Sequence, residues 1–65
     1  MSRPTQSDLP LLRRVDEVVS GMIEHANSMK RASNDAGELL AVAHIIDKLE
    51  SERDSVRRTM RKLQS

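Results

Sequence analysis

The hydrophobic positions in the second half of the chain form one unbroken ladder, with alternating spacings of three and four residues. Its members are Leu39, Val42, Ile46, Leu49, Arg53, Val56, Met60 and Leu63, and Arg53 is the only polar residue among them. This spacing places all of these side chains on one side of an α-helix, as in helices that pack lengthwise against another helix. The pattern therefore predicts a long helix over about residues 35–63 that contacts other helices.

A second ladder with the same kind of spacing runs through the first half of the chain. It consists of Leu12, Val15, Val19, Met22, Ala26 and Met29. The ladder predicts a helix over about residues 8–31, in which Asp8 favours the positive end of the helix dipole and Pro10 is tolerated in the first turn. Gly21 lowers the stability of this helix by about 1 kcal/mol relative to Ala, and it is compatible with close approach of another helix or with a slight bend.

The segment between the ladders is the only part of the chain rich in turn-forming residues. Within it, Asp35 followed by Glu38 resembles a capping box, and Ser33 or Asn34 is an alternative cap for the second helix. A fold at the centre of this segment joins the two predicted helices as neighbours.

Such a fold brings residue i near residue 65 − i, so that the apolar rungs of the two ladders match and Arg53 lies near Leu12. Agreement between two independently identified ladders favours an antiparallel hairpin over a single long helix. We therefore predict an all-α fold, with a flexible tail over residues 1–7 and a single helical-hairpin domain over residues 8–65.

The apolar arcs of both predicted helices are wider than one neighbouring helix covers. In the first helix Leu11, Val18 and Ile23 widen the arc to about 140°, and the second helix is broadest between Ala36 and Leu49. Two hairpins packed face to face form a four-helix bundle, so we expect a homo-oligomer, with a dimer favoured. The predicted interface residues are Leu11, Leu12, Val15, Val18, Val19, Met22, Ile23, Leu39, Leu40, Val42, Ile45, Ile46, Leu49 and Val56.

The composition supports association as the source of stability. A chain of 65 residues without Cys, Phe, Trp or Tyr has no disulfides, and its core consists of small and medium apolar side chains. A core of this size seldom supplies more than about 3–5 kcal/mol. The two histidines, without thiols or clustered carboxylates, make no structural zinc site. Oligomerisation therefore remains as the additional source of stability.

Basic side chains gather in the last turns of the second predicted helix, namely Arg53, Arg57, Arg58, Arg61 and Lys62. One interpretation is that these side chains lie in solvent, where their positive charges stabilise the negative end of the helix dipole. The other is binding of a phosphate backbone or an acidic protein surface, with help from Arg13 and Arg14. Arg53 itself is explained either by a salt bridge that fixes register, with Asp16 within a turn, or by contact with an anion.

The sequence contains no recognisable catalytic constellation. There is no Cys nucleophile, the serines have no histidine at a recognisable spacing, and the carboxylates of the second helix spread around it. His25 and His44 do not come together as a metal pair, and each is expected in solvent or at an interface. We expect no enzyme, cofactor or metal. With a net charge of +1, no apolar run that spans a bilayer and no secretory signal, we expect a cytoplasmic protein without a membrane partner.

In helix length and heptad pattern, residues 8–63 resemble the small helical-hairpin proteins of plasmids and phages, a group that includes RNA-binding repressors dimerising as antiparallel four-helix bundles. The resemblance is one of architecture and supplies no binding residues. The leading hypothesis is a small non-catalytic protein–protein interaction module, an adaptor, inhibitor or regulator of the phage or plasmid kind, acting on itself or on a larger protein. The alternative is an RNA- or DNA-binding regulator that uses the basic end of the second helix.

Overall fold

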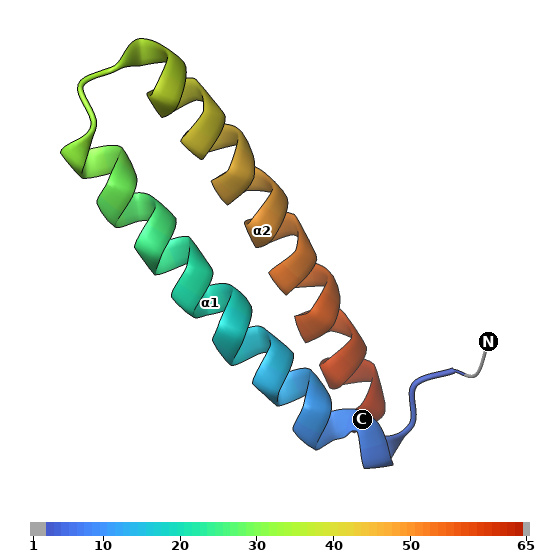
Figure 1. Cartoon of the computed structure of the whole chain (residues 1–65). Coiled ribbons are helices and arrows are strands. Elements are labelled where there is room, and N and C mark those ends of the chain that lie inside the picture. Colours follow the sequence, from blue (N-terminus) through green and yellow to red (C-terminus); the bar gives the residue numbers. More distant parts are fainter. Residues whose placement is uncertain (1–2, 65) are drawn as a thin grey trace.

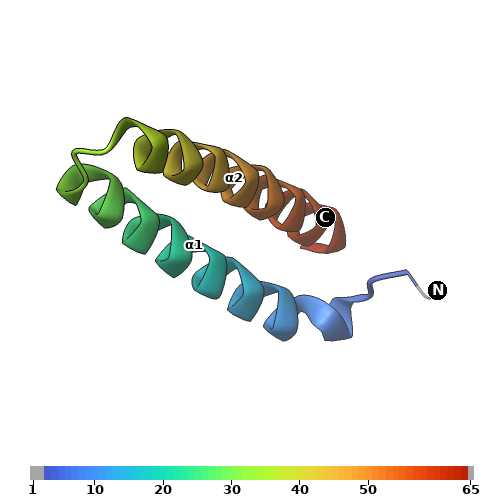
Figure 2. The same ribbon diagram turned by 45° about the horizontal axis from the view of Figure 1, so that its top comes forward.

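A computed structural model describes residues 3–64, which form two long helices joined by a short connection (Figure 1). A 3-10 turn, η1 (Gln6–Asp8), leads into α1 (Leu9–Ala32), and α2 (Ala36–Gln64) follows. The two views show the helices side by side and antiparallel, with the connection at one end and the start of α1 beside the end of α2 at the other (Figures 1 and 2). The predicted all-α antiparallel hairpin is confirmed, and each helix begins and ends one residue later than expected.

The amino-terminal end is held by a small set of polar contacts. The Thr5 N–H donates to Asp8 Oδ2 over 2.8 Å, and the Asp8 N–H donates to the Thr5 carbonyl over 2.9 Å. The side chain of Gln6 donates to the carbonyl of Leu63 over 3.2 Å, which ties η1 to the end of α2. Residues 6 and 7 of the predicted tail therefore belong to a helical turn, while residues 1 and 2 lie outside the described residues.

Asp35 is the amino-terminal cap of α2. Its Oδ1 accepts the backbone N–H groups of Gly37 at 2.8 Å and Glu38 at 3.1 Å, amides that have no partner within the helix. Ser33 Oγ accepts the Asp35 N–H at 3.3 Å and donates to Glu38 Oε2 at 2.7 Å. The capping box is thus completed through Ser33, and these bonds fix the direction in which α2 leaves the connection.

The core is a short seam between the two helices. It consists of Ile23 and Ala26 from α1 and Val42 and Ile46 from α2, with Val19 and Leu49 packed against them. Every member of the α2 ladder is buried or half-buried, so this ladder faces α1 as its spacing predicts. The hairpin therefore has one narrow line of apolar contact and no wider interior in the described chain.

The side of α1 that faces α2 differs from the prediction. Met22 and Met29, predicted to lie in the seam, are each 50% exposed, whereas Ile23 is only 6% exposed. The reason is that α1 carries two interleaved ladders with the same spacing. We call them the inner ladder, which is Leu12, Asp16, Val19, Ile23 and Ala26, and the outer ladder, which is Leu11, Val15, Val18, Met22, His25 and Met29. The inner ladder faces α2, where it buries Ile23 and brings Asp16 to a basic partner.

The pairing of the helices is also shifted from the prediction. Arg53 contacts Ser20 instead of lying near Leu12. Ser20 lies about two helical turns closer to the connection than Leu12 does. Because α1 continues to Ala32, the chain folds at residues 33–35, later than assumed. Helical side chains also lean toward the amino terminus of their own helix, so an arginine of α2 reaches toward the connection.

The hairpin has a large surface for its size. It measures 44 × 20 × 18 Å, and its radius of gyration of 14.7 Å exceeds the value of about 11 Å typical of a compact domain of this length. Its accessible surface of 5264 Å² compares with about 4,200 Å² for a compact monomer of 7.3 kDa. A single hairpin thus exposes roughly 1,100 Å² more than a compact protein of its mass.

Candidate functional site

The seam between the helices has two flanks of different character. On one flank a groove of about 450 Å³ runs between α1 and α2, and we call it the apolar groove. It is lined by Val18, Gly21, Met22, His25, Ala26 and Met29 of α1 and by Val42, Ile45 and Leu49 of α2. Two of these residues, Ala26 and Val42, belong to the core, so the groove opens directly onto the interior of the hairpin.

The walls of the apolar groove are large side chains that are half exposed. Val18, Met22, Met29 and Ile45 have between 50% and 52% of their surface exposed. Leu11 is 65% exposed and continues the outer ladder of α1 beyond the groove. Exposed apolar side chains that are contiguous in this way are typical of surfaces that bind a partner.

Gly21 is the one groove residue without a side chain. A Cβ atom placed on Gly21 has no atom of residues 3–64 within 4 Å, apart from its own neighbourhood in the helix. The contacts within the described chain therefore do not require a glycine at this position, even though glycine lowers the stability of a helix interior. Gly21 leaves a gap in the groove wall that is open to the outside.

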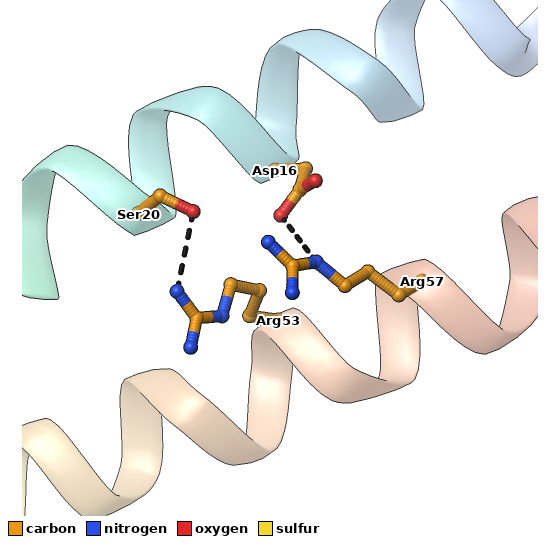
Figure 3. Close-up of polar contacts among 4 residues, drawn as sticks. All are labelled: Asp16, Ser20, Arg53 and Arg57. Atoms are coloured by element: carbon orange, nitrogen blue, oxygen red, sulfur yellow. Dashed lines mark hydrogen bonds and ion pairs between the residues drawn. The ribbon is translucent and has the colours of Figure 1, made fainter.

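The other flank of the seam is polar, and we call it the polar flank (Figure 3). Arg53 Nη1 donates to Ser20 Oγ over 3.4 Å, and Arg57 Nε lies 3.1 Å from Asp16 Oδ1. Both arginines extend from α2 across the seam to α1, as Figure 3 shows. The side chains of Arg57 and Asp16 are 49% and 22% exposed, so the pair contributes less than about 1 kcal/mol, while its direction helps to set the rotation of α1.

The predicted basic cluster is divided in the structure. Arg57 pairs with Asp16 across the seam, and Arg58 lies 3.6 Å from Asp54 within α2. Arg57 and Arg61 line a shallow hollow together with Arg13 of α1, and Asp54, Met60 and Gln64 complete it. Lys62 lies elsewhere, beside Arg3 and Leu63. The structure thus brings three arginines from two helices together, and it does not bring all five predicted basic residues to one place.

The predicted interface residues occupy three environments. Ile23, Val42 and Ile46 are in the core. Half-buried positions along the seam are Leu12, Val15, Val19, Leu39, Leu49 and Val56, and exposed positions are Leu11, Val18, Met22, Leu40 and Ile45. Leu40, 74% exposed, does not line the apolar groove.

Four groove residues were not among the predicted interface positions, namely Gly21, His25, Ala26 and Met29. The spacing of the outer ladder contains a signal for two of them, because it continues from Met22 to His25 and Met29 with steps of three and four residues. Gly21 is not part of an apolar ladder, and the sequence indicates only that a glycine there is compatible with close approach of another helix or with a slight bend.

Within residues 3–64 no three His, Cys, Asp or Glu side chains come close enough to hold a metal ion, and neither helix is long and apolar enough to cross a membrane. No protein-family model, curated protein or solved structure matches the chain. A function is therefore inferred from the apolar groove and from the charges on the polar flank.

Proposed function

We propose that this chain is a small non-catalytic interaction protein that binds helical surfaces through its apolar groove, and that two copies associate into a four-helix bundle. The observation that carries the proposal is the groove itself, in which Val18, Met22, Met29 and Ile45 are half exposed beside the core. An amphipathic helix laid along such a groove buries these side chains and extends the core outward.

The surface of the hairpin supports association. A protein interface of standard size buries about 800 Å² on each partner. This lies within the roughly 1,100 Å² by which the chain exceeds a compact monomer of its mass. Burial of apolar surface contributes about 25 cal/mol for each Å², a large gain for a hairpin in which four of the described residues are buried. Folding and association are thus expected to be coupled, so that stability rises with protein concentration.

The same groove fits one amphipathic helix of a larger protein. In that case the chain acts as an adaptor, inhibitor or regulator by exchanging its own second copy for the foreign helix. The polar flank stays in solvent in both complexes, because its charges already meet partners within the chain. Self-association and binding of a larger protein are then competing uses of one surface.

The test is light scattering over a range of protein concentrations, with circular dichroism on the same samples. The wild type is expected to be a helical dimer. Val18→Asp places a charge on the groove wall and is expected to shift the mass to that of a monomer, because the carboxylate would be desolvated in the interface. Leu40→Asp is the matched control, since Leu40 is exposed outside the groove. Equal effects of the two substitutions, or a stable helical monomer of the wild type, would contradict self-association through the groove.

A second candidate function is binding of RNA or DNA at the open end of the hairpin. It is favoured by the hollow in which Arg13, Arg57 and Arg61 converge from two helices. Phosphate binding by these side chains predicts an affinity for duplex RNA or DNA that falls steeply with salt and is lost in Arg13→Ala together with Arg61→Ala. Arg58→Ala is the control, because Arg58 does not line this hollow. Binding that is insensitive to salt and to all these changes would exclude this function.

A further inference from the structure

We infer that, in the dimer, α1 of one chain packs antiparallel against α1 of the second copy, with the two helices closest at Gly21. The inference rests on the proposed function, because it specifies the partner and geometry of the same apolar groove. It places the two α1 helices inside the assembly along their outer ladders.

The spacing of the outer ladder fits an antiparallel copy of itself. From Leu11 to Met29 its steps are four, three, four, three and four residues, so the ladder reads the same in both directions and has its midpoint at residue 20. A twofold axis at the midpoint therefore aligns all rungs at once. It pairs Leu11 with Met29 of the second copy and Val18 with Met22 of the second copy.

The exposed apolar side chains favour α1 over α2 as the docking helix. Four of them belong to the outer ladder of α1, namely Leu11, Val18, Met22 and Met29, and each is at least half exposed. From α2 only Ile45 is both exposed to this extent and part of the groove. A partner helix along α1 therefore covers more apolar surface than one along α2.

The row of residues beside the outer ladder supports the same antiparallel arrangement of the two α1 helices. Arg14, Gly21 and Ser28 follow one another at intervals of seven residues, so they form one row along α1 with Gly21 at its centre. In the antiparallel pair, Arg14 faces Ser28 of the second copy, and Gly21 faces its own counterpart near the twofold axis. No like charges oppose each other along this row.

The contacts of the described residues do not explain why a glycine stands at position 21. Among the described residues, no atom outside its own stretch of helix lies within 4 Å of a Cβ placed there, yet the glycine lies on the wall of the groove. The distance between packed helices depends on the side chains at the point of contact. A glycine next to the midpoint of the ladder permits the two α1 helices to approach closely where they cross.

The first experiment uses disulfide cross-linking, because the chain has no cysteine of its own. Leu11→Cys and Met29→Cys chains are mixed under reducing conditions, oxidised, and analysed by intact mass without reductant. The antiparallel arrangement predicts that the mixed dimer exceeds either homodimer at least tenfold. Efficient homodimers of Leu11→Cys alone and of Met29→Cys alone would show a parallel pair and overturn the inference.

The second experiment substitutes Gly21 and measures helix content and association separately. Gly21→Leu is expected to raise the dimer dissociation constant at least tenfold, since it separates the two α1 helices. At protein concentrations at which both proteins are dimeric, its helix content is expected to equal or exceed that of the wild type, because leucine favours a helix more than glycine and a Cβ atom at this position meets no described atom outside its own stretch of helix. Gly21→Ala is expected to act in the same directions with a smaller effect on association. Unchanged or tighter association of Gly21→Leu would overturn the inference.

The two failures can be told apart by the mass of the wild type. A wild-type dimer that lacks the mixed cross-link keeps the proposed function and rejects this geometry. A wild type that remains a helical monomer at all concentrations rejects both.

Discussion

The apolar groove and the polar flank lie on opposite sides of the same seam, yet their side chains differ in how far they find partners within the chain. On the polar flank, Arg53 and Arg57 reach across to Ser20 and Asp16, so the charged side chains find partners within the hairpin. On the groove side, Val18 and Met22 remain half exposed. The polar flank has partners within the fold, and the apolar groove is the surface proposed to bind a second molecule.

The two flanks contribute to the packing of the helices in different ways. Directional contacts on the polar flank set the rotation and register of the helices, but each contributes little because its side chains remain in contact with water. The groove contributes through area, which is non-directional and grows with the surface covered. A hairpin can therefore be specified by one flank and stabilised through the other.

The largest effect is expected at the core that both flanks share. Ile46→Ala removes a side chain that is 9% exposed and is expected to lower the free energy of unfolding by about 2–4 kcal/mol. Urea unfolding followed by circular dichroism measures the loss. Leu40→Ala serves as the control and is expected to stay within about 0.5 kcal/mol of the wild type. Similar losses in the two variants would contradict the placement of the core.

The next largest effect is expected on dimerisation, for a substitution in the wall of the apolar groove. Met22→Ala shortens a side chain of the groove wall that is half exposed in the hairpin. Each copy is expected to contribute about 1–1.5 kcal/mol less to the free energy of association, because less apolar surface is buried in the interface. Because a twofold interface contains the site twice, the dimer dissociation constant should rise about 30- to 150-fold. Sedimentation equilibrium measures this constant. A change of less than about threefold would mean that Met22 is not in the interface.

The third prediction concerns the replacement of one arginine of the polar flank by an apolar residue. Arg53→Leu completes the α2 ladder, and since Arg53 is held only by a 3.4 Å contact with Ser20, the free energy of unfolding is expected to rise by about 1 kcal/mol. The substitution is also expected to produce larger species in light scattering, because it adds an apolar side chain to the polar flank and removes the directional contact with Ser20. A destabilised variant of uniform mass would show that Arg53 contributes more than register.

The smallest effect is expected at the ion pair. Asp16→Asn removes the charge that faces Arg57 and is expected to lower the free energy of unfolding by about 0.5 kcal/mol. The difference from the wild type should shrink as salt is raised from about 0.01 M to 1 M, because screening weakens the pair. Urea unfolding at the two salt concentrations tests this. A loss above about 2 kcal/mol would mean that the polar flank stabilises the hairpin as strongly as the core does.

The two helices and the side of α2 that faces α1 could be predicted from the sequence, because one ladder dominates α2 and turn-forming residues occur in only one segment. Asp35 was among the predicted caps, and its carboxylate accepts the amides of Gly37 and Glu38. These features depend on neighbours a few residues away, which the sequence displays directly.

The rotation of α1 could not be predicted in the same way. Its inner and outer ladders have equal spacing, and periodicity alone does not choose between Ile23 and Met22 as the buried residue. The choice depends on contacts with α2, including that of Asp16 with Arg57, and these join residues far apart in the chain. The pairing of Arg53 depends in turn on where the chain folds back, which shifts the partner by about two turns.

The bond between Gln6 and Leu63 has a practical consequence for protein engineering. It holds the two ends of the hairpin beside each other, at the end opposite the connection (Figure 1). A segment whose ends are adjacent can be inserted into a surface loop of a host protein without stretching that loop. The hairpin is therefore suited to display as an insertion cassette, in which the connection around Asp35 points away from the host and the groove stays accessible along the side.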